Sequence, residues 1–266
     1  MNPGFSFGSY VSGTSCVHRL DPRTKLIAGC VFIVVLLCAK SAAALAVCAA
    51  FTALCYALAQ IPPSKAARSL APLMAIVVIV AVLNLVVTQG GQVLVDGGIL
   101  RISDAGVQTC LFMGARLTIM MLGMSLITLT TMTIDLTEAF EWVLKPFARF
   151  GVPAHELGMI MGIALRFMPQ FANELAVVYH AQVSRGARLS NSPARGVRML
   201  TSLMVPLFTS VFRHAETLSA AMDARCYHGG EGRTHLHPLR FAPRDAAAAA
   251  FMAVLAGCVA AIGYLL

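Results

Sequence analysis

The sequence predicts an all-α membrane protein with about five transmembrane helices and a long amphipathic helical region before the last of them. Of its 266 residues, 58% are hydrophobic and only 12% are charged, about half the charged fraction typical of a soluble domain. Long apolar runs recur along the chain, and Lys and Arg gather in the connections between them. A soluble domain of this size would need more polar residues to cover its surface.

The first apolar stretch extends from Leu26 to Ala59 and is interrupted only by Lys40 and Ser41. Because one helix needs about 20 residues to cross the hydrocarbon of a bilayer, this stretch is too long for one span and short for two. It therefore predicts two short, tilted helices joined by a tight turn at Lys40.

Three further apolar runs follow. Ala71 to Val87 predicts the third span and Val107 to Leu129 the fourth, with a polar, Gly-rich link from Gln89 to Asp104 between them that carries a turn at Gly97-Gly98. The last run, Ala246 to Leu266, has no charged residue and predicts the fifth span.

The positive charges indicate the orientation of the chain. They lie before the first span, between the second and third, and in the long stretch before the last: Arg19, Arg23, Lys25, Lys65, Arg68 and the basic segment from Lys145 to Arg244. The positive-inside rule places these segments, with the amino terminus, in the cytoplasm and Leu266 outside. The predicted divisions are a cytoplasmic segment 1–25, spans one to four in 26–132, a cytoplasmic helical region 133–244 and the last span in 245–266.

The cytoplasmic region contains two amphipathic segments. Apolar residues recur at three- and four-residue steps from His155 to Tyr179 and again from Val197 to Met222, which is typical of helices with one apolar face. Pro169 and Pro206 lie inside these segments, where proline kinks or divides a helix. They are candidate hinges, although a proline in a helix is also often a fixed bend. Three alternatives remain for such helices: a docking surface for a partner, a paddle on the membrane surface, or a solvated helical hairpin.

Each amphipathic segment ends in an arginine between small residues. The first ends in Ser184-Arg185-Gly186 and the second in Ala224-Arg225-Cys226. Glycine suits the end of a helix because it adopts the left-handed backbone without strain. An arginine at such an end presents a planar fork of donors to carboxylates or carbonyls of a partner.

Four motifs stand out along the chain: Leu20-Asp21-Pro22-Arg23-Thr24-Lys25, Pro146 through Gly151-Val152-Pro153, Ala164-Leu165-Arg166-Phe167-Met168-Pro169, and Asp223-Ala224-Arg225 followed by Gly229-Gly230-Glu231-Gly232-Arg233-Thr234. They resemble the motifs of one membrane protein family, the T component of energy-coupling factor transporters (EcfT/CbiQ). The resemblance covers essentially the whole chain, and the motifs occur in the expected order.

The resemblance implies that two cytoplasmic coupling helices each end in an Ala-Arg-Gly triplet, which docks into a groove on one of two ABC ATPases of the A and A' types. The matching residues are Ser184, Arg185 and Gly186 in the first triplet and Ala224, Arg225 and Cys226 in the second. This sequence departs from the pattern with Ser184 in place of Ala and Cys226 in place of Gly. The second departure leaves open whether Cys226 accepts the backbone conformation of a glycine.

The resemblance also implies a function. The chain would be the transmembrane scaffold of an importer in the plasma membrane of a prokaryote. It would transmit ATP-driven motion of the ATPases to a small substrate-binding S component, which topples in the bilayer during vitamin or metal-ion uptake. ATP and Mg²⁺ would be bound by the ATPases, and no cofactor, metal or nucleic acid is expected on this chain.

The sequence lacks the nucleotide-binding and zinc-protease motifs of an enzyme that works alone. It has no GxxxxGK[ST], GxGxxG or HExxH motif. An intramembrane enzyme acting on a lipid or isoprenoid is the alternative function, but the apolar cores of the five predicted spans contain no Asp or Glu. A secondary transporter meets the same objection and would usually need an internal repeat.

Several single residues have both a functional and a structural interpretation. Arg116, inside the fourth apolar run, is interpreted as a residue that snorkels to the outer interface rather than a functional charge. Asn84 is interpreted as an interhelical hydrogen-bonding group. The spacing of His228, His235 and His237 matches no metal-binding pattern, and the eight cysteines contain no CxxC pair, so free thiols are expected.

Overall fold

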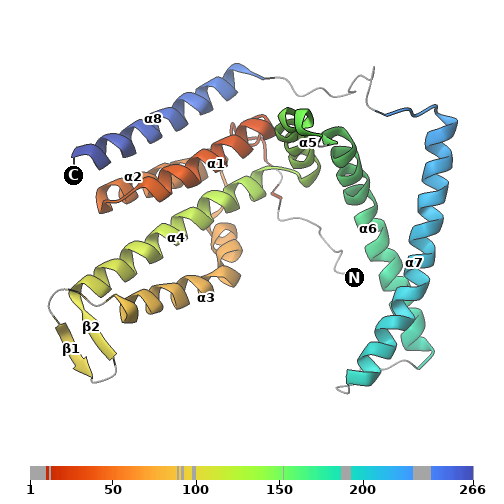
Figure 1. Cartoon of the computed structure of the whole chain (residues 1–266), viewed down its shortest axis with the longest axis horizontal. Helices are drawn as coiled ribbons and strands as arrows, with labels where there is room; N and C mark the ends of the chain where they lie inside the picture. Colours follow the sequence, from red (N-terminus) through yellow and green to blue (C-terminus); the bar gives the residue numbers. More distant parts are fainter. Residues whose placement is uncertain are drawn as a thin grey trace. The chain divides into compact units, whose positions relative to one another are not determined.

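The computed structural model describes residues 10–11, 13–88, 90, 93–97, 100–151, 153–186, 193–229 and 241–265. These residues are almost entirely helical (Figure 1). In chain order the elements are α1 (Pro22–Cys38), α2 (Ala42–Ala59), α3 (Pro63–Val87), β1 (Val93–Gly97), β2 (Leu100–Ser103), α4 (Asp104–Thr130), α5 (Thr133–Leu144), the 3₁₀ helix η1 (Lys145–Phe150), α6 (Ala154–Ser184), α7 (Pro193–Ala224) and α8 (Pro243–Leu265).

The chain divides into two compact units. The membrane unit includes Gly8–Ala139 and Pro238–Leu266, and the paired-helix unit includes Phe140–His237. Within the described residues, four helices are long and apolar enough to cross a membrane: α2, α3, α4 and α8. The all-α membrane fold is therefore confirmed.

The helix expected as the first span is shorter than the others. Its 17 residues rise about 25 Å at 1.5 Å per residue, against about 30 Å for the hydrocarbon core of a bilayer. Helix α1 starts where the sequence favours a start, because the Asp21 side chain accepts a hydrogen bond from the Arg23 N–H and Pro22 occupies the first turn. It ends at Cys38, and α2 begins after the N-cap Ser41, so Lys40 lies in the predicted turn.

Helices α1, α2, α4 and α8 pack around a common apolar core in the membrane unit, with Leu36 and Cys48 fully buried. Two glycines allow α1 and α4 to approach closely. A Cβ added at Gly123 would lie 2.4 Å from the ring of Phe32, and one added at Gly29 would lie 2.3 Å from Cδ1 of Ile127. Each helix thus places a bulky side chain against a glycine of the other, as is common in membrane helix pairs.

We expect Gly123→Ala to weaken the packing of α1 against α4, because the added methyl overlaps the Phe32 ring. Overpacking of this kind costs about 1–3 kcal/mol. The matched control is Gly257→Ala in α8, where an added Cβ meets nothing within 4 Å. Thermal unfolding of the two variants in detergent measures the effect, and equal melting temperatures would contradict the predicted close contact.

The connection between α3 and α4 differs from the simple link that was expected. It contains an antiparallel hairpin in which β1 pairs with β2, with an irregularity between Val93 and Val95. The predicted turn begins at Gly97, the last residue of β1, whereas Gly98 lies outside the described residues. At the base of the hairpin, the Ser103 hydroxyl donates to the Thr88 carbonyl at 3.0 Å and accepts from the Gly106 N–H.

Two polar side chains in the membrane helices donate hydrogen bonds to backbone carbonyls. The guanidinium of Arg116 donates to the carbonyl of Ala39, at the end of α1, and lies 4.8 Å from the ring centroid of Phe112. This carbonyl is one that α1 leaves unpaired at its end, so the contact gives Arg116 a structural role. Asn84 was expected to bond across helices, but its amide donates to the Val80 carbonyl of its own helix at 2.8 Å. The cysteines are free thiols, as predicted.

In the paired-helix unit, α6 has 31 residues and α7 has 32. Pro169 lies inside α6 and Pro206 inside α7, and neither proline divides its helix. The two helices pack against each other and cross in Figure 1. Both are longer than the amphipathic segments seen in the sequence, because the small and polar residues at their ends continue the helix.

Candidate docking site

Helix α6 ends in a turn that uses the special conformation of glycine. Arg185 is the C-cap residue, and its backbone N–H lies 3.2 Å from the Ala181 carbonyl and 3.1 Å from that of Gln182. Gly186 follows with a φ of 89°, in the left-handed region, and its N–H donates to the Val183 carbonyl at 2.9 Å. This backbone pattern satisfies carbonyls that the end of a helix leaves unpaired.

Helix α7 ends in the same kind of turn, although a cysteine takes the place of the glycine. Cys226 has a φ of 53°, and its N–H donates to the Asp223 carbonyl at 2.9 Å. The Tyr227 N–H donates to the Met222 carbonyl at 3.1 Å, which completes a Schellman motif. Cys226 thus adopts the conformation of a glycine, at a cost of about 1–2 kcal/mol for a residue with a Cβ.

Both helix ends are open to a partner. Ser184, Arg185 and Gly186 are exposed, and so are Ala224, Arg225 and Cys226. Within the described part of the chain, neither the Arg185 nor the Arg225 guanidinium has a hydrogen bond or an ion pair. Two arginines therefore lie at equivalent positions, immediately before a left-handed residue, with their donors available.

The two ends lie at opposite ends of the helix pair. The hydroxyl of Tyr227, just after α7, lies 2.8 Å from the sulfur of Met159, near the start of α6. Arg185 follows 26 residues after Met159, which corresponds to about 39 Å of helix. The two arginines therefore form two separate contact points.

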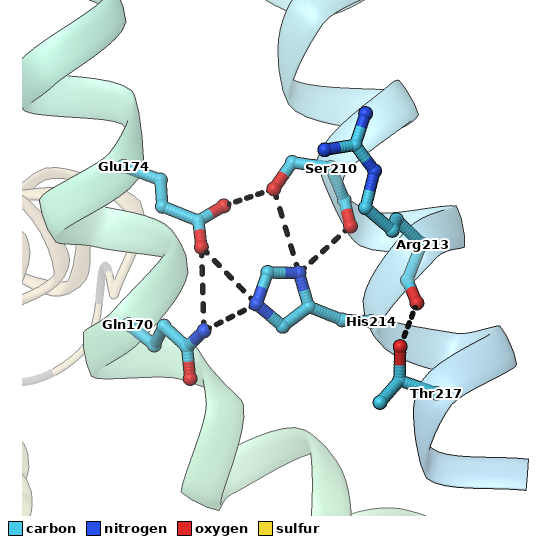
Figure 2. Close-up of polar contacts among 6 residues, drawn as sticks. All are labelled: Gln170, Glu174, Ser210, Arg213, His214 and Thr217. Carbon is cyan, nitrogen blue, oxygen red and sulfur yellow. Dashed lines mark hydrogen bonds and ion pairs between the residues drawn. The ribbon is translucent and has the colours of Figure 1, made fainter. Parts of the chain in front are cut away.

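A polar cluster joins the two helices near the middle of each (Figure 2). The Ser210 hydroxyl of α7 donates to the Glu174 carboxylate of α6 at 2.7 Å, and the His214 ring lies 3.5 Å from the same carboxylate. The Gln170 amide contacts both Glu174 and His214. The hydrogen bond from Ser210 is the main cause that lowers the pKa of the Glu174 carboxyl, so Glu174 accepts hydrogen bonds as a carboxylate at neutral pH.

Both prolines lie beside this cluster. A groove of about 590 Å³ at the contact of the two helices is lined by residues that include Pro169, Glu174, Pro206 and Ser210. The sequence pattern indicates the prolines but not the polar residues around them. The available signal was a pair of polar residues four apart in each helix, Gln170 with Glu174 and Ser210 with His214, inside segments selected for their apolar positions.

The histidines near the end of α7 were not expected to bind a metal. His228 is exposed, and His235 and His237 lie outside the described residues. Among the residues that the structure describes, no three His, Cys, Asp or Glu side chains form a group that could hold a metal ion.

Cys226 offers a direct test of the helix-end geometry. Cys226→Gly is expected to keep the turn with less strain, whereas Cys226→Val should disrupt it because a β-branched residue disfavours positive φ. Thermal unfolding of the two variants in detergent measures the effect. We expect Cys226→Gly to melt at or above the temperature of the unmodified chain and Cys226→Val to melt at a lower one, and equal melting temperatures for the two variants would contradict the left-handed turn at residue 226.

Comparison with known proteins gives a consistent result. The family model CbiQ, described as "Cobalt transport protein", matches residues 13–236. The chain is 42% identical over 243 residues to the energy-coupling factor transporter transmembrane protein EcfT of Acidaminococcus fermentans, covering 91% of this chain and 90% of the relative. It is 43% identical to EcfT of Thermosediminibacter oceani over 244 residues, 91% of this chain and 92% of the relative. With EcfT of Bacillus subtilis the identity is 36% over 250 residues, 94% of each chain.

Proposed function

Because the chain belongs to the CbiQ family of transport proteins, with relatives that are EcfT transmembrane proteins, we propose that it couples two ABC ATPases to a substrate-binding S component. The chain is the transmembrane component of an energy-coupling factor transporter. In this role the chain holds the ATPases at two points and passes their motion to the S component during uptake of a vitamin or metal ion.

The observation that carries the proposal is the pair of equivalent helix ends. Arg185 and Arg225 each occupy the last position before a left-handed residue, both are exposed, and about 39 Å of helix separates the two ends. Two equal contact points at this distance suit two separate ATPases, of the A and A' types, better than one partner. The guanidinium of each arginine would bind carboxylates or carbonyls in a groove of its ATPase.

An apolar stripe on α7 supports the S component as the second partner. Val197, Val205, Phe208 and Phe212 follow one face at helical spacing, and each is at least 58% exposed. Exposed apolar side chains in such a row mark an interface with protein or lipid. We assign the stripe to the S component, because a partner that moves in the membrane must contact the helices that the ATPases move.

The polar cluster provides a pivot for this motion. Arg185 lies 11 residues beyond Glu174, and Arg225 lies 15 residues beyond Ser210, so the two arms measure about 16 and 22 Å. A rotation of about 10° at the crossing would move the docking ends by about 3–4 Å. ATP and Mg²⁺ would be bound by the ATPases, and Pro169 and Pro206 would let each helix bend next to the pivot.

The charge distribution supports an orientation. The amino terminus and the paired-helix unit would lie in the cytoplasm of a prokaryotic cell, where the ATPases are, and the end of α8 would lie outside. The chain itself would act as a coupling subunit and not as an enzyme.

The experiment that tests this function is purification of the chain in mild detergent from the membranes of its own cells, followed by mass spectrometry. We expect two ATP-binding cassette proteins and a small, apolar membrane protein to purify with it. Recovery of the chain without any ATPase, under conditions that keep ATPase complexes of other transporters intact, would contradict the proposal.

A further inference from the structure

The first turn of α1 contacts both ends of the segment that joins α4 to α8. Helix α4 ends at Thr130 and α8 begins at Pro243, and the 112 residues between them include α5, α6 and α7. All the contacts described next lie within the membrane unit.

Lys25 holds the first of these ends. Its side chain is buried, at 6% exposure, and its ammonium donates to the Thr130 carbonyl at 2.9 Å and to the His18 carbonyl at 3.2 Å. The Thr130 carbonyl lies at the end of α4, where helix carbonyls lack partners and the helix dipole is negative. A buried cation at this point therefore fixes the end of α4 to α1 across 105 residues of sequence.

Lys25 also interacts with the start of α5. Burial raises the pKa of the Asp135 carboxyl, and the nearby Lys25 ammonium opposes that rise. The same cation thus acts on both sides of the connection between α4 and α5.

Asp245 holds the second end. One oxygen of its carboxylate accepts from the Ala242 N–H at 2.8 Å and so caps the start of α8, while the other accepts from the Asp21 N–H at 2.9 Å. Asp245 is 5% exposed and Asp21 is 7% exposed. Asp21 in turn caps α1, as described above, so one buried carboxylate joins the first turns of α1 and α8.

These contacts are directional and buried. Apolar packing could hold the same helix ends without the cost of removing charges from water. However, helices in apolar contact slide past each other more easily than helices joined by hydrogen bonds between a charged group and the backbone. The polar contacts occur at the two places where motion of α6 and α7 must pass along the chain into the membrane helices.

We propose that Asp21, Lys25 and Asp245 form a clamp that transmits the motion of the paired-helix unit to the membrane unit. They are positioning residues for transport, because they fix the ends of α4 and α8 to α1. The inference rests on the proposed coupling function and adds the route by which force enters the membrane helices.

The test uses the complete transporter in proteoliposomes, in a chain whose native cysteines are replaced. Asp21→Cys together with Asp245→Cys opens the clamp, and Lys25→Met opens it at α4. We expect both variants to keep their ATPases and at least half of the ATP hydrolysis, while substrate uptake per ATP hydrolysed falls at least tenfold. Lys25→Arg, which keeps the cation, should retain most of the uptake.

A short, reducible thiol cross-linker between residues 21 and 245 should restore uptake per ATP in the double-cysteine variant, and reduction should abolish it again. A residue that only stabilises the fold would not give this reversible change at constant ATPase content. The matched control is Ser41→Ala, which removes the N-cap hydrogen bond of α2 at the other end of α1 and should leave uptake per ATP unchanged.

Normal uptake per ATP in the opened variants, or failure of the cross-linker to restore it, would overturn the clamp. The ATPase content and uptake of the unmodified transporter, measured in the same preparation, test the proposed coupling function separately.

Discussion

The double variant Arg185→Ala/Arg225→Ala is expected to lose ATP-driven uptake completely while remaining in the membrane. Both guanidinium groups are exposed at helix ends, so their removal disturbs no buried contact among the residues that the structure describes. Loss of a hydrogen-bonded charge at an interface costs about 2–5 kcal/mol, so each ATPase, held by one of the two arginines, should bind about 30- to 5,000-fold more weakly. Uptake of the substrate and co-purification of the ATPases measure the effect.

The matched control is Arg149→Ala/Arg213→Ala. It removes the same charge from exposed arginines of the same unit, and neither of these arginines belongs to an Ala-Arg-Gly-like triplet. We expect the control to keep both ATPases and to transport normally. A double variant of Arg185 and Arg225 that holds both ATPases at normal stoichiometry would show that the docking assignment is wrong.

The second large effect is expected at the crossing of α6 and α7. Glu174→Ala together with Ser210→Ala removes two contacts between the helices, the 2.7 Å hydrogen bond and the contact of the carboxylate with His214. ATPases should remain bound, because the docking ends are untouched, but transport per ATP should fall severalfold because the helices no longer rotate about a fixed point. The control is Thr209→Val, which removes a neighbouring hydroxyl whose hydrogen bond, among the described residues, is to the Val205 carbonyl of the same helix.

Cross-links distinguish a pivot from a general contact. In a chain without native cysteines, a link between Glu174→Cys and Ser210→Cys should be tolerated, since it lies on the axis of rotation. A link between Met159→Cys and Tyr227→Cys, at the α7 end of the pair, should block transport because these residues must separate. Equal inhibition by the two links would contradict rotation about the cluster.

The sequence predicts the membrane helices well because long apolar runs have few other interpretations in a chain this hydrophobic. It also predicts the break at Lys40, because a charged and a polar residue interrupt the apolar run there. The hairpin between α3 and α4 was missed because its strands have only five and four residues, too short for a clear alternating pattern.

The polar contacts could not be predicted in the same way, because their partners are distant in the sequence. Lys25 was counted among the charges that flank the first span, whereas the structure buries it against a carbonyl 105 residues away. Glu174 and Ser210 lie on different helices, so neither helical pattern reveals their contact. For Cys226, the residue type argued against a left-handed turn, and only the hydrogen bonds at the end of α7 show that the turn forms.

The most direct test of the central claim is native mass spectrometry of the purified complex, with the two docking ends altered one at a time. We expect the unmodified chain to carry one ATPase of each type, Arg185→Ala to lose one of them preferentially and Arg225→Ala to lose the other. If both single variants lost the same ATPase, or if neither lost any, the claim that the two helix ends hold two separate ATPases would be contradicted.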